Sequence, residues 1–350
     1  MYSIRTEPAR DAVTSAPSVT VIVPAYNAEA TLPACLEAIG RMTHPAAEII
    51  VFSDGATDST PRIAEASGAT VIHNVGPSRG PGHGRNVASR RATSQLLLFV
   101  DADVVISPTC LATLIADMQE NGATAAFASY DNQPRSTRVA GLYANLRHHF
   151  VHQNSTREAT TFWSGVGLID RQVFLDVGGY DEVMFAQPSI EDVELGMRLK
   201  AHGHRIRLVP EALAKHCKDW TLWRVWHTDV VRRALPWSRL LLAGKSDGAD
   251  LNLSSAERIK ALLAVAVFGS TIVALIEPGA LFATGLLFGA YAYLNRHFIQ
   301  VLARNLTTSQ WIRATLLHLC YHAYSLGAYA WAMAGHNLQS AFGPPRVQQD

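Results

Sequence analysis

Residues 96–106 read LLLFVDADVVI, and this stretch decides the fold that we expect. The residues from Leu96 to Val100 are all apolar, which is typical of a strand buried on both faces of a parallel sheet. Asp101 and Asp103 follow this run directly. An unpaired buried carboxylate costs more free energy than one strand gains by packing. We therefore expect both carboxylates to lie just beyond the strand end, where a partner can reach them.

Similar short apolar runs occur earlier in the chain, at residues 19–24, 48–53 and 69–73, and segments of helical character separate them. One helix is expected to begin at Thr60, because Pro61 suits the first helical position. The alternation of strand and helix predicts an α/β domain whose Rossmann-like, mostly parallel sheet is flanked by helices. Ligands of such sheets bind beyond the carboxyl ends of the strands.

Polar residues gather at these expected strand ends. Tyr26 follows the first strand, Asp54 follows the second, and the two aspartates follow the fourth. The loop before the fourth strand is rich in glycine and carries Arg85, so backbone and guanidinium groups there can approach an anion. One such group alone would be an ordinary turn, but several strands that deliver polar groups to one edge predict a ligand site.

The overall composition limits the class of protein. In 350 residues, 30 Lys and Arg balance 29 Asp and Glu, so no overall electrostatic field attracts nucleic acid. The four cysteines lie far apart without a CxxC pair, which suits reduced thiols in a cytosol. Residues 1–17 lack the apolar core of a signal peptide and are expected to form a flexible tail.

The C-terminal part has a different composition. Residues 261–276 and 280–295 carry no charge, and a weaker apolar run follows at 314–335. These runs predict about three transmembrane helices within 259–338 and a C-terminal tail at 339–350, while a buried helical hairpin in a soluble domain is the alternative. Arginine and lysine flank the runs on one side only. They predict a multi-pass protein of the inner (cytoplasmic) membrane whose N-terminal domain faces the cytoplasm.

Residues 218–258 connect the two parts and mix tryptophan with arginine. The tryptophans are Trp220, Trp223, Trp226 and Trp237. Aromatic and basic side chains directly before a membrane region are typical of a helix that lies in the lipid headgroups. We therefore expect an amphipathic, interfacial segment over 218–258.

Six segments of the chain form a series, and in chain order they read VTVIVPAYNAEATLPACLEAI, SDGATDST, GPGHGRNVASRRA, LLLFVDADV, SGVGLIDRQVFLDVGGYDE and SIEDVELGMRL. Taken together, they resemble glycosyltransferase family 2, whose domains have the GT-A fold. The resemblance covers residues 18–217, the size of one α/β domain. It implies a GT-A catalytic domain there, in a bacterial-type member of the family that is anchored in the membrane.

The resemblance also implies roles for the residues at the strand ends. Those expected to bind the nucleotide sugar are Pro24, Ala25, Tyr26, Asp54, Arg85 and Asp101. The departing diphosphate needs a divalent cation, and Mn²⁺ or Mg²⁺ prefers carboxylate oxygen. Asp103 is the expected metal ligand, with Asp101 beside it. His216, at the end of an expected strand over 211–216, is either a further ligand or a structural histidine.

Glu191 and Asp192 form a second acidic pair, to which the resemblance assigns catalysis. Asp192 would act as the general base that deprotonates the acceptor hydroxyl, in a single displacement with inversion. Residues 189–192 also fit a capping box at a helix start, and the two roles are compatible.

The acceptor side is expected around three residues. Trp163 offers an aromatic plane for a sugar, or else packs in the core, and Gly165 permits close approach. Asp181 lies in the segment GGYDE and could contact sugar hydroxyls.

Together these features predict a metal-dependent hexosyltransferase of envelope biosynthesis. Its donor would be a nucleotide sugar, expected to be a UDP-sugar, and its acceptor a lipid or lipid-linked molecule at the membrane; no nucleic acid is expected. One alternative is a polysaccharide synthase, although the chain lacks that group's QxxRW motif. The other is a non-catalytic protein that binds nucleotide sugars, or a scaffold, within an envelope complex.

Overall fold

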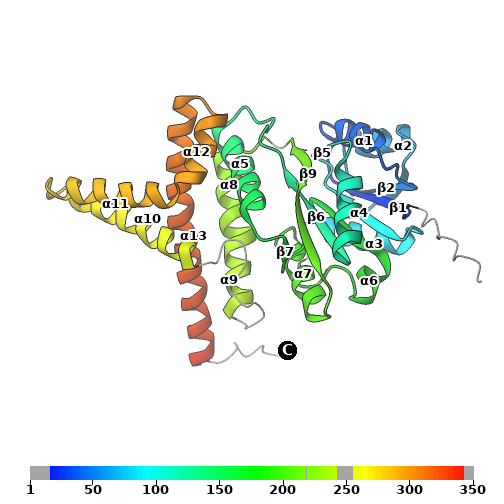
Figure 1. Ribbon diagram of the computed structural model, residues 1–350. Helices are drawn as coiled ribbons and strands as arrows, with labels where there is room; N and C mark the ends of the chain where they lie inside the picture. Colours follow the sequence, from blue (N-terminus) through cyan, green and yellow to red (C-terminus); the bar gives the residue numbers. More distant parts are fainter. Residues whose placement is uncertain (1–15, 186, 218, 243–254, 343–350) are drawn as a thin grey trace, which may run out of the picture.

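The computed structural model describes residues 16–185, 187–217, 219–242 and 255–342, with the backbone alone from residue 336 onward. Most of the two expected tails, at 1–17 and 339–350, lies outside the described residues. The remainder forms an α/β part and a group of C-terminal helices that pack against it (Figure 1).

The centre of the α/β part is one mixed sheet. The described strands are β1 (Val19–Ala25), β2 (Glu48–Asp54), β3 (Thr70–Asn74), β4 (Leu96–Val100), β5 (Val104–Ile106), β6 (Ala125–Tyr130), β7 (Glu158–Ala159), β8 (Val166–Asp170) and β9 (Ile206–His216). Their order is β3-β2-β1-β4-β8-β6-β9-β5, and β7 pairs with β9. The expected strands at 19–24, 48–53, 69–73, 96–100 and 211–216 all correspond to strands of this sheet.

The prediction of a mostly parallel sheet is wrong. β1, β2, β3 and β4 are parallel to one another, and β6 is parallel to β9. However, β8 runs antiparallel to both β4 and β6, and β9 runs antiparallel to β5 and β7. The sequence periodicity could not reveal this difference, because a strand that is covered on both faces is apolar in either direction.

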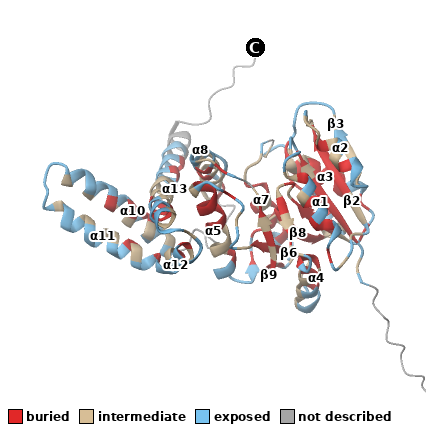
Figure 2. Ribbon diagram, turned by 90° about the horizontal axis from the view of Figure 1, so that it is seen from above, coloured by how far each residue is buried: buried red, intermediate tan, exposed pale blue. Residues whose placement is uncertain are grey.

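Alternating side chains of the strands face two separate layers of helices. Val21 and Val23 of β1 pack with α1 (Leu32–Gly40), α2 (Thr60–Ala66) and α4 (Cys110–Asn121) on one face. Ile22, between them, packs with α3 (Pro81–Arg91), α6 (Arg171–Asp176) and α7 (Glu191–Ala201) on the other. Successive strand residues point to opposite faces. The all-apolar strands are therefore explained by burial on both sides, as Figure 2 shows by their colour.

The C-terminal helices join the α/β part through helix α5 (Val139–Asn154). Tyr143 and Leu146 of α5 share a buried cluster with Phe298 and Leu302 of α12 (Arg296–Asn305) and with Ala314 of α13 (Thr308–Phe342). Further along, α8 (Leu222–His227), the π-helix η1 (Thr228–Ala234) and α9 (Leu235–Leu242) lie between α5 and α13. α10 (Ser255–Ala274) and α11 (Ala280–Leu294) form a hairpin that projects away from the rest (Figure 1).

Part of the expected interfacial segment is folded into this assembly. Trp220 packs with Ala140 and Ala144 of α5, whereas Trp223 and Trp226 stack on each other and remain exposed. Contact of 218–258 with lipid headgroups stays a prediction, and residues 218 and 243–254 lie outside the described chain.

The predicted transmembrane helices over 259–338 are not supported. Within the described ranges, no helix combines the length and the apolar character needed to cross a membrane. α11 has 15 residues, which at about 1.5 Å per residue reach about 22 Å, less than the ~30 Å hydrocarbon core. α10 has 20 residues, but Glu257, Arg258 and Lys260 occupy its first turns. The alternative of a buried hairpin also fails, because much of the hairpin surface is exposed (Figure 2).

Candidate active site

The carboxyl ends of β1, β2 and β4 meet at one edge of the sheet. β1 lies between the other two and is parallel to both, so Tyr26, Asp54 and Asp101 leave the sheet on the same side. Pro24 and Ala25 are the last residues of β1, and the Tyr26 side chain after them is 57% exposed. The sequence therefore placed these strand ends correctly, and a planar aromatic side chain is available to a ligand there.

Asp54 organises the glycine-rich loop that follows β3. Its carboxylate accepts hydrogen bonds from the backbone N–H groups of Arg79 (3.0 Å) and Gly80 (2.8 Å) and from the side chains of Asn74 (2.8 Å) and Ser78 (2.7 Å). Burial raises the pKa of Asp54, but these hydrogen bonds outweigh it and lower the pKa below its ordinary value. Asp54 is thus ionised and holds the loop in place beside the expected nucleotide position.

Asp101 has a side-chain partner. The buried guanidinium of Arg85, on α3, donates to Asp101 at 2.6 Å. Burial lowers the pKa of Arg85, but the charges of Asp101, Tyr180, Glu191 and Asp192 raise it above its ordinary value. Arg85 therefore binds the strand-end carboxylate directly and is close enough to the acidic pair of α7 for their charges to affect its pKa.

Asp103 and His216 lie next to each other because β5 pairs with the end of β9. The register sets Val104 opposite His216, and the His216 Nε2 atom is 3.7 Å from an Asp103 carboxylate oxygen. The other ring nitrogen, Nδ1, is 2.6 Å from the Asn145 side-chain oxygen, and the ring stacks on Tyr130. This second contact orients the imidazole so that Nε2 faces the carboxylate.

These two side chains suit a divalent cation as part of its ligand set. A carboxylate oxygen and an imidazole nitrogen are competent ligands for Mn²⁺. In the part of the chain that the structure describes, no group of three or more histidine, cysteine, aspartate or glutamate side chains could hold a metal ion by itself. The arrangement fits a cation that takes its remaining ligands from a bound diphosphate and water.

Glu191 and Asp192 begin helix α7, but the expected capping box does not form. The Ser189 hydroxyl donates to the Arg232 carbonyl instead (2.8 Å), while the Glu191 carboxylate accepts from the Ser189 N–H (2.7 Å). Glu191 is thus occupied with the helix start. Burial, followed by the charge of Glu191, raises the pKa of Asp192 to about 7. Such a carboxyl group can accept a proton near neutral pH, which is what a general base must do.

Trp163 and Gly165 touch each other in the site. A Cβ atom on Gly165 would come within 2.5 Å of the Trp163 ring, so the glycine leaves the space that the indole fills. The ring also packs edge-on against Tyr130 and His152. Trp163 is therefore held in the core on one side and lines a cavity on the other.

Asp181 contacts nearby backbone groups, whereas its neighbour Glu182 contacts helix α3. Asp181 accepts from the backbone N–H groups of Val183 and Met184 and closes a turn. Glu182 binds Asn86 (2.8 Å) and His83 (2.6 Å) of α3 and thereby ties this loop to the helix that carries Arg85. Glu182 was not predicted as a site residue, although it belongs to the same GGYDE segment.

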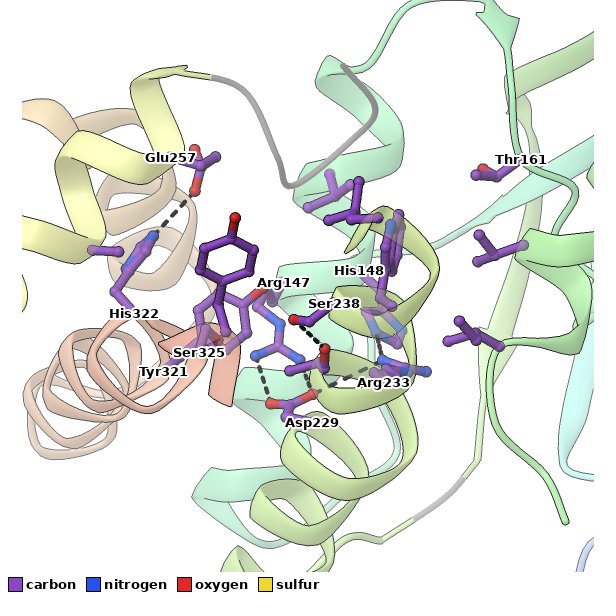
Figure 3. A pocket seen from close by; sticks show the side chains of 18 of the residues that line it. Arg147, His148, Thr161, Asp229, Arg233, Ser238, Glu257, Tyr321, His322 and Ser325 are labelled. Carbon is purple, nitrogen blue, oxygen red and sulfur yellow. Dashed lines mark hydrogen bonds and ion pairs between the residues drawn. The ribbon is translucent and has the colours of Figure 1, made fainter. Parts of the chain in front are cut away.

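A buried charge network was also missed. The Arg147 guanidinium on α5 binds both carboxylate oxygens of Asp229 on η1 (2.7 and 2.8 Å), and Tyr324 of α13 donates to the same carboxylate (2.7 Å). Arg233 lies 4.0 Å from Asp229 and hydrogen-bonds to His148 (2.7 Å), as Figure 3 shows. A π-helix is rare and is often found at functional sites. No spacing in the sequence pairs these residues, because they come from three separate helices.

Comparisons with known proteins agree with this geometry. Residues 20–178 match the family model described as Glycosyl transferase family 2. The glycosyltransferase GlyG of Streptococcus pneumoniae is 28% identical over 162 residues, which are 45% of this chain and 54% of the relative. A 4,4′-diaponeurosporenoate glycosyltransferase of Staphylococcus aureus is 36% identical over 110 residues, 30% of this chain and 29% of the relative. The chain thus spans about half or less of the length of these relatives.

A solved structure extends the likeness to the C-terminal helices. The mannosyltransferase PcManGT from Pyrobaculum calidifontis, in complex with GDP-Man and Mn²⁺, aligns with 91% of this chain and 88% of its own. The TM-score is 0.55 and the sequence identity 18%, which establishes a shared fold.

Proposed function

We propose that this chain, whose residues 20–178 form a glycosyltransferase family 2 domain with a GT-A-like fold, transfers a sugar from a nucleotide-sugar donor to an acceptor hydroxyl with inversion. One observation carries the proposal. Buried Arg85 binds Asp101 at the strand end and lies within the electrostatic reach of Asp192, so the expected donor site and the expected base share one centre.

The donor is a nucleotide sugar, and we expect a UDP-sugar. Pro24, Ala25 and Tyr26 would contact the nucleoside at the end of β1, and Asp101 the ribose or metal-bound water. Asp54 contributes to base recognition and also holds the loop that carries Arg79 and Gly80. The Arg85 guanidinium, which pairs with Asp101, would also contact the diphosphate.

A divalent cation, Mn²⁺ or Mg²⁺, would be held by Asp103 and His216. When bound, the cation stabilises the negative charge that develops on the departing diphosphate. The neighbouring Asn145 keeps the His216 ring in the orientation that this requires. The solved mannosyltransferase of similar fold holds Mn²⁺ together with GDP-Man, in agreement with this assignment.

Asp192 takes the acceptor proton. The acceptor oxygen forms a new bond to the anomeric carbon as the bond between that carbon and the diphosphate oxygen breaks, and the hydroxyl proton passes to Asp192. Attack opposite the leaving group inverts the anomeric configuration in one step. Glu191 supports this role through its charge, which helps to raise the pKa of Asp192. Trp163 lines the cavity on the acceptor side, and Gly165 leaves the space that its indole fills. Contact of Asp181 with sugar hydroxyls stays a prediction.

The acceptor is a lipid or lipid-linked molecule, and the enzyme acts at the cytoplasmic face of the inner membrane. The α10–α11 hairpin supports this placement, because large apolar side chains such as Ile272, Ile276 and Phe282 are between 64% and 88% exposed. Exposed apolar patches of this extent mark interaction surfaces. Basic residues, Arg258 and Arg296, lie at the hairpin base, where anionic lipid headgroups would meet them.

The decisive experiment is donor turnover with a panel of nucleotide sugars, each with Mn²⁺, Mg²⁺ or EDTA and with membrane lipid extract as the acceptor source. We expect turnover that EDTA abolishes and that Asp103→Asn reduces strongly. Asp176→Asn, on the exposed surface of α6, is the matched control and should retain activity. Metal-independent turnover, or full activity in Asp103→Asn, would contradict the proposal.

Membrane contact is tested separately by flotation with vesicles of phosphatidylglycerol and phosphatidylethanolamine. The protein should float with the vesicles, and Ile272→Glu with Phe282→Glu should remain at the bottom of the gradient. Val183→Glu changes an even more exposed apolar residue in the α/β part, and this variant should float normally. If the hairpin variant also floats, or if it only changes the oligomeric state in solution, the hairpin surface serves another partner.

A further inference from the structure

A cavity of about 660 Å³ lies between the α/β part and the C-terminal helices (Figure 3). At one end its wall contains Asp192 together with Ile190 and Val193 from the start of α7. At the other end it reaches Ala261 and Leu262 of α10. One space therefore connects the expected general base with the projecting hairpin, although residues from separate elements enclose it. Its size is typical of cavities that bind small molecules.

The wall between these ends is largely apolar. It includes Val151, Trp163, Trp237, Leu241, Leu326 and Tyr329. Several of the charged groups that line it have partners: Arg147 binds Asp229, Arg233 hydrogen-bonds to His148, and Glu257 hydrogen-bonds to His322. Water gains few hydrogen bonds along such a wall, so an apolar ligand is favoured over a polar one.

Two polar ring atoms in this wall have no hydrogen-bond partner among the described residues: Nδ1 of His152 and Nε1 of Trp237. His152 is only 7% exposed. Buried polar atoms without partners are uncommon and costly in folded proteins. Neither atom is accessible from the cavity, so the class of ligand follows from the apolar wall and from Asp192 at its end.

The far end of the cavity opens onto the hairpin. Leu262 lines the cavity and is also 60% exposed, so the same side chain belongs to the cavity wall and to the outer surface of α10. A molecule that leaves a lipid or micellar phase along this helix would meet the cavity before it meets Asp192.

We propose that this cavity binds the apolar body of the acceptor, an elongated lipid-like molecule whose hydroxyl group lies at Asp192 and whose chain runs past Trp237 and Leu241 toward Leu262. The inference rests on the proposed function and adds the site that binds the apolar chain of the acceptor. Chain length then governs affinity, because each buried methylene contributes about 0.8 kcal/mol, which corresponds to about a fourfold change in binding.

The test uses a series of straight-chain alcohols, from butanol to dodecanol, as acceptors with an accepted donor. For the wild-type protein, kcat/KM should rise up to about fourfold per methylene. Ala261→Phe narrows the cavity far from Asp192 and should flatten this rise, so that the ratio between dodecanol and butanol falls at least about tenfold. Val265→Phe, which changes the same helix outside the cavity, should keep the wild-type ratio.

A second readout needs no turnover. A dansylated medium-chain fatty acid should bind the wild-type protein with enhanced fluorescence, dodecanol should displace it, and Ala261→Phe should weaken its binding. If Ala261→Phe does not fold by circular dichroism, Leu262→Trp at the cavity mouth replaces it in both assays. A rate that is independent of chain length, or an unchanged ratio in the folded variant, overturns the inference. Absence of any donor turnover together with normal probe binding would instead refute the proposed function.

Discussion

The α/β part and the α10–α11 hairpin bury their apolar residues in opposite ways. In the α/β part, the strands lie between two layers of helices, and residues such as Ile22 and Phe99 are fully buried. Along the hairpin, Leu275 and Ile276 are more than four-fifths exposed. The first region is stabilised by its own packing, whereas the second presents an apolar surface that the described residues leave uncovered.

The distribution of polar side chains also differs between the two parts of the molecule. The interior of the helical part holds a chain of hydrogen bonds in which Tyr143 and Asn295 contact His318, and Tyr291 and Glu257 contact His322. Soluble domains more often keep such groups at the surface. The helical part thus buries several polar side chains beside its apolar clusters and leaves many apolar side chains exposed, and this distribution explains why its sequence resembled membrane spans.

The largest expected effect is on chemistry in the α/β part. Asp192→Asn removes the proposed base and should lower kcat by about 10²–10⁴-fold, with little change in donor affinity. In the wild-type protein, kcat should rise with pH through about 7, where Asp192 loses its proton. Steady-state kinetics between pH 5 and 9 would measure kcat, and calorimetry would measure the affinity for the donor. A variant that keeps wild-type kcat would exclude Asp192 as the base.

The same substitution should also stabilise the fold. The pKa of Asp192 is raised from 3.8 to about 7 on folding. The stability that its protonated form contributes is therefore complete below pH 3.8 and is lost as pH rises through about 7. Asn imitates the protonated acid at every pH, so Asp192→Asn should raise Tm more at pH 8 than at pH 5. An equal Tm shift at both pH values would contradict the raised pKa.

The next largest effect concerns the buried contact between helix α5 and the π-helix η1. Arg147→Met leaves the buried Asp229 carboxylate without its main partner and should cost about 3–5 kcal/mol in the free energy of unfolding. The double variant Arg147→Met/Asp229→Leu removes both charges and should recover most of that loss. Urea unfolding monitored by tryptophan fluorescence would measure this. Arg157→Met breaks an exposed ion pair with Glu211 and should cost less than about 1 kcal/mol.

A smaller effect is expected where Asp54 holds the glycine-rich loop. Asp54→Asn weakens four charge-assisted hydrogen bonds and should cost about 1–3 kcal/mol at pH 7. The pKa of Asp54 is lowered on folding, so its contribution is present above the unfolded value of 3.8 and is lost as pH falls through the lower folded value. The variant should therefore lose less stability than the wild-type protein on acidification below pH 4. If the free energy of unfolding fell equally with pH in the variant and in the wild-type protein below pH 4, this role of Asp54 would be contradicted.

The sequence predicted the strand positions and the clustering of carboxylates because both depend on local patterns. Apolar runs of strand length and the residues that follow them determine which side chains meet at the sheet edge. The partner of Asp101 was not predictable in this way: Arg85 reaches it from α3, and the expected cation is matched more closely by Asp103 and His216. The antiparallel strand β8 and the Arg147–Asp229 pair depend on contacts between distant segments, which no local spacing reveals.

The hairpin sequence was misread for a related physical reason. An uncharged helix is equally consistent with a membrane span, a buried core helix and an exposed docking face, since composition alone does not state what surrounds the helix. Helix length and the charges at the start of α10 distinguish these cases, and both depend on where the helices begin and end.

The smallest expected effect is also the most direct test of the contrast between the two regions. Ile272→Val, on the exposed side of α10, should change the free energy of unfolding by less than about 0.5 kcal/mol, because the side chain loses little contact when it is shortened. Ile22→Val removes the same methyl group from the fully buried β1 strand and should cost about 0.5–1.5 kcal/mol. Chemical denaturation of both variants without detergent or lipid gives the comparison. An equal loss at the two positions would mean that the hairpin is already covered in solution, for example by a second copy of the chain, and its apolar surface would then not be available to a membrane.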